Sequence, residues 1–108
     1  MDEERPLLEA VVEMTSASVD RAGMEWRDLT RARLAALAAM GAPPASYVLN
    51  VAAAVDTGLT LEDIRSVLIA VAPIIGTART VAAASAISEA LGIAIALDDS
   101  IGRQEFAS

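Results

Sequence analysis

The sequence contains no cysteine and no histidine among its 108 residues. Without cysteine, the chain can form no disulfide, no thiolate metal site and no thiol nucleophile. Without histidine, it also lacks the imidazole on which many metal centres and hydrolases depend. A metal site made of carboxylates alone is not predicted either, because no tight acidic cluster lies at helical spacing on an apolar face. We therefore expect neither a metal nor a cofactor.

Lysine is absent as well, so the eight basic residues are all arginine. They stand against 15 acidic residues, and the net charge is -7. Nucleic-acid binding depends on clustered cations that neutralise phosphates. The only local concentration, Arg27, Arg31 and Arg33, has Glu25 and Asp28 beside it, which favours an exposed helix face with local ion pairs. The composition therefore predicts no nucleic-acid partner.

Aromatic residues make up only 3% of the chain, and much of its apolar content is alanine. Because alanine buries little area, a single chain should have a thin core. We expect contacts between subunits to add to the burial, the alternative being a monomeric alanine-rich bundle. The apolar runs at 67–76 and 93–97 are too short to span a bilayer, and the start, MDEERP, is acidic where a signal peptide would be basic. A cytoplasmic protein with no membrane partner is predicted.

Apolar residues recur at helical spacing, and no strand alternation is visible, so the sequence predicts an all-α fold. The predicted helices cover about residues 6–22, 29–40, 43–57, 61–75 and 78–91, and residues 93–97 form either a sixth short helix or an extended arm. Asp28 is expected to cap the second helix, and Gly92 to end the fifth. The third helix is apolar nearly all round, which predicts that it is buried. Residues 1–97 thus form a single predicted domain, followed by a polar tail at 98–108.

Residues 28–91 contain two helix junctions in a characteristic order. An apolar helix ends in GLT at 58–60 and is followed by EDI at 62–64. Further on, APIIG at 72–76 leads into a helix of small residues. In the order and spacing of these segments, the chain resembles the carboxymuconolactone decarboxylase family, which includes the alkyl hydroperoxidase D type proteins. The resemblance implies an alkyl hydroperoxidase D-like bundle of five or six helices that assembles into dimers, trimers or hexamers.

The reactive residues of that family are missing from this chain. The peroxidase branch uses a Cys-x-x-Cys pair with a histidine four residues after the second cysteine, and the decarboxylase branch has a Glu-Leu-x-x-His pattern in the same place. At the matching positions this chain has Pro43, Ser46 and Asn50. No thiolate is present for a peroxidase relay, and neither serine nor asparagine titrates near neutral pH. The resemblance therefore indicates a divergent, non-redox member without thiol peroxidase activity.

Four residues form the candidate pocket: Ser46, Tyr47, Asn50 and Arg31. Ser46 and Asn50 are four apart on one face of a first helical turn, with Tyr47 adjacent, and together they could hydrogen-bond a small polar ligand between subunits. The structural alternative, which is favoured, has Ser46 capping or back-bonding the helix and Asn50 in a buried polar network. In it, Tyr47 fills the core with its hydroxyl at the surface. The lone tryptophan, Trp26, is expected to seal one end of the core, with ligand stacking as its alternative role.

Two functions follow from these residues, and both stay open. The first is a homo-oligomeric small-molecule-binding or structural protein, whose ligand would be a small organic acid. The second is a cofactor-free lyase or decarboxylase-type enzyme on a small organic acid or lactone, with Arg31, Arg33 or Arg79 as a carboxylate clamp. For each of these arginines, a solvent-facing ion pair is the favoured interpretation. A subunit that pairs with a catalytically complete relative is a third hypothesis. No catalytic residue is assigned.

Overall fold

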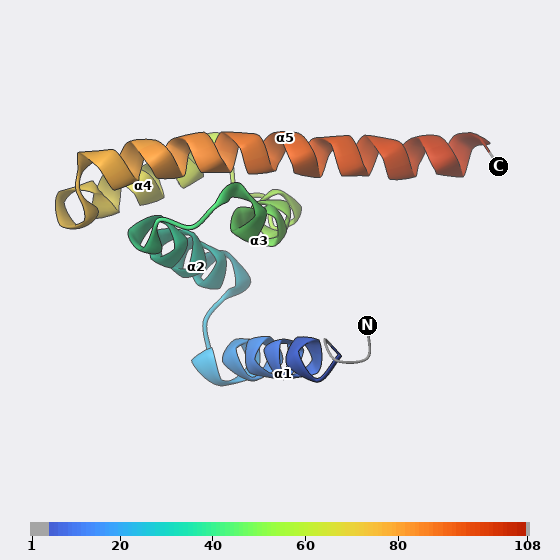
Figure 1. Ribbon diagram of the computed structural model, residues 1–108, viewed down its shortest axis with the longest axis horizontal. Helices are drawn as coiled ribbons and strands as arrows, with labels where there is room; N and C mark the ends of the chain where they lie inside the picture. The colour runs from blue at the N-terminus through green and yellow to red at the C-terminus, as the bar shows by residue number, and fades with distance from the viewer. Residues whose placement is uncertain (1–4, 108) are drawn as a thin grey trace.

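The computed structural model describes residues 5–107, with side-chain environments for residues 5–96. Five helices follow one another: α1 (Arg5–Ala22), α2 (Trp26–Met40), α3 (Pro44–Asp56), α4 (Leu61–Ile75) and α5 (Thr77–Ala107). No strand occurs among these residues, which confirms the predicted all-α class. The longest helix, α5, runs along the top of the molecule in Figure 1, with α2 and α3 beneath it and α1 at the bottom.

Four helices, α2 to α5, enclose a small common core. Helix α5 packs against α2, α3 and α4, and α2 packs in turn against α3 and α4. The core consists of Leu34, Ala38, Tyr47, Val51, Ala54, Leu59, Ile64, Leu68, Ala83, Ala86, Ile87 and Ala90. The largest fully buried side chains in this set are Tyr47, Leu34 and Val51. With so many alanines beside them, these three provide much of the apolar volume of the core.

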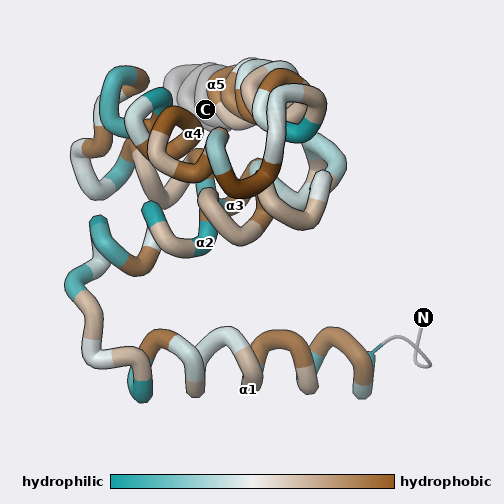
Figure 2. Tube along the Cα trace, turned by 90° about the vertical axis from the view of Figure 1, so that its left-hand side faces the viewer, coloured by the Kyte–Doolittle hydropathy of each residue, from teal (hydrophilic) through white to brown (hydrophobic). Residues whose placement is uncertain are grey.

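Helix α1 stands apart from this bundle. None of the closely packed helix pairs includes α1, and no residue of α1 is buried. Figure 2 shows α1 separated from the other helices, to which residues 23–25 connect it. Among the described side chains, one hydrogen bond joins α1 to the bundle, donated by Arg33 Nη2 to Ser18 Oγ at 3.3 Å.

Local signals in the sequence account for several helix ends. The Asp63 N–H donates to Thr60 Oγ1 at 3.1 Å, and the Thr60 N–H donates to the Asp63 carboxylate at 2.8 Å, so the two residues form a complete capping box. Gly41 and Gly58 have φ of +68° and +83°. At both glycines, successive N–H groups donate to carbonyls of the preceding turn, as in a Schellman motif. A left-handed residue there favours glycine, and these predicted boundaries hold.

Two arginines donate hydrogen bonds to backbone carbonyls at the C-terminal ends of neighbouring helices. Arg27 Nε donates to the Thr57 carbonyl oxygen at 2.7 Å, and Arg79 Nη1 donates to the Ala39 carbonyl oxygen at 2.7 Å. These carbonyls lie at the C-terminal ends of α3 and α2, where free acceptors and the negative end of the helix dipole favour a cation. The guanidinium of Arg79 therefore serves a helix end and not a carboxylate pocket.

Two predicted helix boundaries are wrong. Helix α2 begins at Trp26 with Glu25 as its N-cap, and the Asp28 carboxylate, in the first turn, accepts a hydrogen bond from Arg31. Helix α5 does not end at Gly92 but continues to Ala107, through most of the segment predicted as a tail. Gly92 lacks the positive φ of a C-cap. A glycine inside a helix costs only about 1 kcal/mol, so the surrounding helix formers outweigh it.

The predicted burial of α3 on all sides is also wrong for the single chain, because Leu49 is 82% exposed. Helix α3 packs closely against α2 and α5 only, which leaves one of its faces without a neighbour. Other exposed apolar side chains include Met40, Leu61, Ile69, Ile74, Val81 and Ile95. By length and composition alone, Thr77–Ala96 is long and apolar enough to cross a membrane, a test that core helices of soluble proteins also pass.

The capping box links stability to pH. Hydrogen bonding to the Thr60 backbone, and then to its side chain, lowers the pKa of the Asp63 carboxyl, helped by the positive charges of Arg31 and Arg27. Because the folded-state pKa lies below the unfolded value of about 4, this stabilisation is present above that value and is lost as pH falls through the folded pKa. Asp63→Asn is therefore expected to lower the melting temperature at neutral pH, with a deficit that shrinks in acid. Thermal denaturation over a pH series measures it.

Glu62→Gln is the matched control for this prediction. It removes a carboxylate from the same turn of α4 without removing either hydrogen bond of the box. A deficit for Asp63→Asn that stays constant from neutral to strongly acid solution would contradict the proposed linkage.

Candidate functional site

Tyr47, one of the four predicted pocket residues, lies in the core. Its side chain is 0% exposed, and its hydroxyl is buried with no hydrogen-bond partner among the described atoms. The predicted place of the hydroxyl at the surface is therefore wrong. Burial raises the pKa of this hydroxyl, because a buried phenolate would lose its hydration. Tyr47 is thus a neutral, space-filling residue that faces the packed helices.

Ser46 and Arg31 lie on the surface. Ser46 is exposed in the first turn of α3, and its N–H donates to the Pro43 carbonyl oxygen at 3.0 Å. The N-cap of α3 is Pro43, without a side-chain capping bond, so the predicted capping by Ser46 is wrong. Arg31 pairs with Asp28 at 3.1 Å and with Asp63 at 3.9 Å. These groups are partly exposed, so each pair contributes little to stability. Arg31 is therefore held in surface ion pairs, the interpretation that the sequence favours.

A pocket of about 560 Å³ lies between α1, α2 and α3. It is lined by Met14, Thr15 and Ser18 of α1, by Trp26, Arg33, Ala36 and Leu37 of α2, and by Leu49, Asn50 and Ala53 of α3. Its volume is within the range of small-molecule sites, about 300–1,000 Å³. Of the four predicted pocket residues, Asn50 lines this pocket, and Ser46, Tyr47 and Arg31 do not.

Helical spacing explains how each helix contributes to the wall. Arg33, Ala36 and Leu37 stand at i, i+3 and i+4 on α2, and therefore share one face of that helix. On α1 and α3, the lining residues follow the spacing i, i+1 and i+4. Each helix thus presents a single stripe to the pocket.

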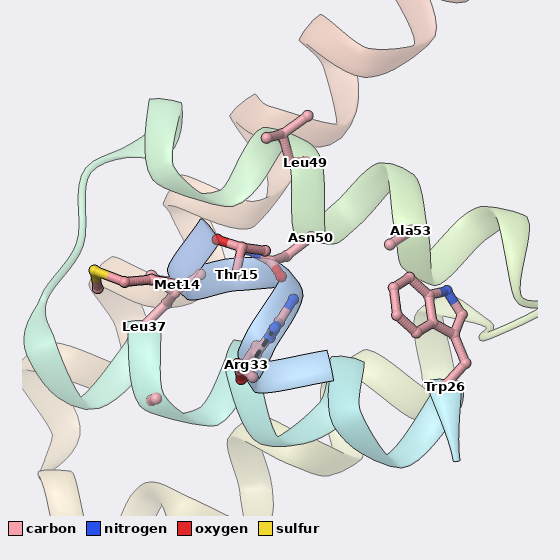
Figure 3. Close-up of a pocket in the computed structure, with 10 residues that line it drawn as sticks. Met14, Thr15, Trp26, Arg33, Leu37, Leu49, Asn50 and Ala53 are labelled. Carbon is pink, nitrogen blue, oxygen red and sulfur yellow. Dashed lines mark hydrogen bonds between the residues drawn. The ribbon is translucent and has the colours of Figure 1, made fainter. Parts of the chain in front are cut away.

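The polar groups of the pocket are few and lie among apolar side chains. Figure 3 shows Arg33, Asn50 and Thr15 near the centre of the view, with Trp26 at one side. Arg33 donates to the neutral Ser18 hydroxyl at 3.3 Å, and the guanidinium has further N–H donors. Trp26 is 46% exposed, so its ring is accessible for stacking. A cationic donor, an amide and an aromatic ring in an apolar pocket suit a small acid with an apolar body.

The sequence indicates part of this set in advance. Arg33 is among the arginines predicted as possible carboxylate ligands, and the ion pair favoured for it is wrong, because its partner among the described residues is the Ser18 hydroxyl. Stacking is the alternative role for Trp26. The role favoured for Trp26, a seal at the end of the core, is wrong, because Trp26 is 46% exposed and lies outside the core cluster. Nothing singles out Thr15 and Ser18, because they are simply polar gaps in the apolar stripe of α1. Only the position of α1 beside α2 and α3 makes them wall residues.

Within the part of the chain that the structure describes, no group of three or more acidic residues is placed to hold a metal ion. Comparison of the chain with protein-family models, with curated proteins and with solved structures gives no match. The function of the chain is therefore inferred from the pocket and from the chemistry of its residues.

Proposed function

We propose that the chain is a non-redox, homo-oligomeric protein of the carboxymuconolactone decarboxylase type that binds a small organic acid in the pocket between α1, α2 and α3. The order of its helix junctions supports the family, and its five-helix, all-α fold is compatible with it. The absence of cysteine and histidine supports a role without thiol peroxidase chemistry. The net charge of -7 supports a protein that works without nucleic acid. A cytoplasmic location is part of the proposal and follows from the acidic start of the sequence.

The observation that carries this proposal is the position of Arg33. Its guanidinium lines an apolar pocket together with Asn50, and no acidic side chain among the described residues pairs with it. An arginine in apolar surroundings binds a carboxylate through charge-assisted hydrogen bonds, with two parallel bonds in the strongest geometry. An amide beside it can donate to the same oxygens or to a neighbouring polar group of the ligand. The apolar wall, with Trp26 and Leu37, would cover the rest of the ligand.

The enzyme alternative has less support. A cofactor-free lyase or decarboxylase-type enzyme would use Tyr47, Ser46 and Asn50 together with an arginine. Of Tyr47, Ser46 and Asn50, only Asn50 lines the pocket, and the Tyr47 hydroxyl is buried away from solvent. Asparagine and arginine do not exchange protons near neutral pH. The pocket thus supports binding and orientation of an acid more than it supports proton transfer.

Ligand binding can be measured as a change in melting temperature. A panel of aromatic, aliphatic and lactone acids should include ligands that raise the melting temperature of the wild-type chain. At a ligand concentration of tenfold Kd, the stabilisation is about 1.4 kcal/mol, or roughly 5–10 °C for a domain of this size. Arg33→Ala and Asn50→Ala are each expected to remove most of this shift, since each deletes a polar group of the pocket.

Arg65→Ala is the matched control, because Arg65 is an exposed arginine of α4 that does not line the pocket. Its ligand-induced shift should equal that of the wild type. A neutral amide analogue of the best acid should also give a much smaller shift. If no acid stabilises the wild type, or if Arg65→Ala loses the shift as fully as Arg33→Ala, the proposed binding site is wrong.

A further inference from the structure

The apolar surface of α1 extends beyond the face of the helix that carries the pocket-lining Met14. At about 100° per residue, Leu7 and Val11 continue the face that carries the pocket-lining Met14. Leu8 and Val12 form a second apolar stripe beside that face, and they are 61% and 63% exposed. The apolar stripe of a surface helix is about 100° wide or more, and Leu8 and Val12 widen that of α1 beyond the stripe that carries Met14. Because both side chains are exposed in the single chain, they are available for another partner.

No charged residue interrupts this apolar arc of α1. Glu9, Glu13 and Asp20 share the opposite side of the helix, by the same spacing. Two copies of the arc can therefore approach the same region without bringing like charges together, although each chain carries a net charge of -7. An acidic chain with an uncharged, apolar helix face is suited to association with itself.

Helix α1 also needs packing that its own chain does not provide. It has 18 residues, and most of the stability of a helix in a protein comes from tertiary packing of its apolar face. None of its residues is buried, and none of the closely packed helix pairs includes it. A partner that covers Leu8 and Val12 would provide the missing tertiary contacts.

The pocket in a single chain is an open trough. Leu49, which lines it, is 82% exposed, and Met14, on the opposite wall, is 70% exposed. Binding pockets commonly bury 70–90% or more of a small ligand, so an open trough is an incomplete site. Met14, which belongs to the exposed arc of α1, lines the same pocket as the exposed Leu49. One chain therefore presents both halves of a self-complementary contact of the kind that forms a two-fold dimer.

We propose that two copies of the chain associate through these surfaces, with Leu8 and Val12 of each copy packed against Leu49 of the other. Each copy then covers the mouth of the other's pocket. For ligand binding, this consequence rests on the function proposed above, whereas the association itself does not depend on any ligand.

The test uses the full-length chain and two single substitutions on α1. Val12→Glu places a charge in the proposed contact, and Ala10→Glu places the same charge on the side of the helix opposite Val12. Glutamate is a better helix former than valine, so Val12→Glu should keep α1 helical, which circular dichroism can verify. Sedimentation equilibrium from micromolar to millimolar chain concentrations gives the dissociation constant. We expect Val12→Glu to raise it by tenfold or more, because a charge would be buried without a partner, and Ala10→Glu to leave it within about twofold.

Fluorescence of Trp26, the only tryptophan, gives a second measurement at the pocket itself. Covering of the pocket mouth should shift its emission to shorter wavelength as the wild-type chain associates. Val12→Glu should show the longer wavelength at every concentration. A monomeric wild type, a Val12→Glu variant that associates like the wild type, or equal losses for Val12→Glu and Ala10→Glu would each overturn the proposal.

These outcomes are separate from those of the ligand test. A wild type that associates through α1 but is stabilised by no acid would refute the proposed function and leave the association standing. A monomeric wild type that binds an acid through Arg33 would refute the association, and with it the homo-oligomeric part of the proposed function, but would leave the acid-binding site standing.

Discussion

Tyr47→Ala is expected to lower the free energy of unfolding by about 3–5 kcal/mol, the loss found when a large buried aromatic side chain is truncated. Tyr47 is fully buried and is one of the few large side chains in a core rich in alanine. Its loss would leave a cavity that small neighbours cannot fill by changing rotamer. Because folded domains are commonly stable by only 5–15 kcal/mol, this variant should unfold at much lower denaturant concentration.

Tyr47→Phe, unlike Tyr47→Ala, is not expected to lower the free energy of unfolding. The hydroxyl is buried without a hydrogen-bond partner, and such a group lowers stability by about 1–3 kcal/mol relative to a satisfied one. Removing the oxygen while keeping the ring should therefore leave the stability unchanged or raise it by about 1 kcal/mol. Urea denaturation followed by circular dichroism, at one fixed chain concentration, measures both variants.

The comparison also tests what Tyr47 does. A purely structural tyrosine predicts that Tyr47→Phe keeps the ligand-induced shift in melting temperature, and Ser46→Ala, next to it but exposed, serves as a neutral control. A loss of more than about 1 kcal/mol in Tyr47→Phe would mean that the hydroxyl has a partner. A lost ligand shift in a stable Tyr47→Phe would instead give this hydroxyl a place in binding.

Leu34→Ala is expected to lower the free energy of unfolding by about 2–5 kcal/mol. Leu34 is fully buried and belongs to α2, which packs against α3, α4 and α5. Truncation removes contacts to several helices at once, and the neighbouring core alanines have no longer side chain with which to fill the space. The same urea series measures the change.

Ile74→Ala is the matched control, because Ile74 is 84% exposed in the last turn of α4. It removes a side chain as large as that of leucine from a surface position, where substitutions usually change stability by no more than about 0.5 kcal/mol. Comparable losses in Leu34→Ala and Ile74→Ala would contradict the core described above. They would indicate that the face of α4 with Ile74 is covered in solution.

Most of the helix pattern could be predicted from the sequence, because its causes are local. The capping box at Thr60 and Asp63, and the left-handed glycines Gly41 and Gly58, act within a few residues of the helix ends. The errors fall where a local signal is weak or competes with another. Gly92 resembles a stop signal, yet the helix formers on both sides keep α5 continuous.

The pocket could be predicted only in part. The polar turn of the sequence predicts Asn50 as a pocket residue, whereas for Arg33 and Trp26 a role in ligand binding is only the alternative interpretation. The helical spacing of Ser46 and Asn50 does not by itself place both in the pocket, because the rotation of α3 against its neighbours decides which residues face it. In the structure that rotation places Asn50 in the wall, Tyr47 in the core and Ser46 at the surface.

Composition and short-range periodicity are sufficient to predict the all-α class, the lack of thiol and imidazole chemistry, and the acidic charge. They do not predict that α1 stands off the bundle or that Arg33, Asn50 and Trp26 line one pocket, which depends on how the helices pack. The physical reason is that periodicity fixes which residues share a face of one helix. The packing of different helices, which depends on all their side chains together, decides which faces meet.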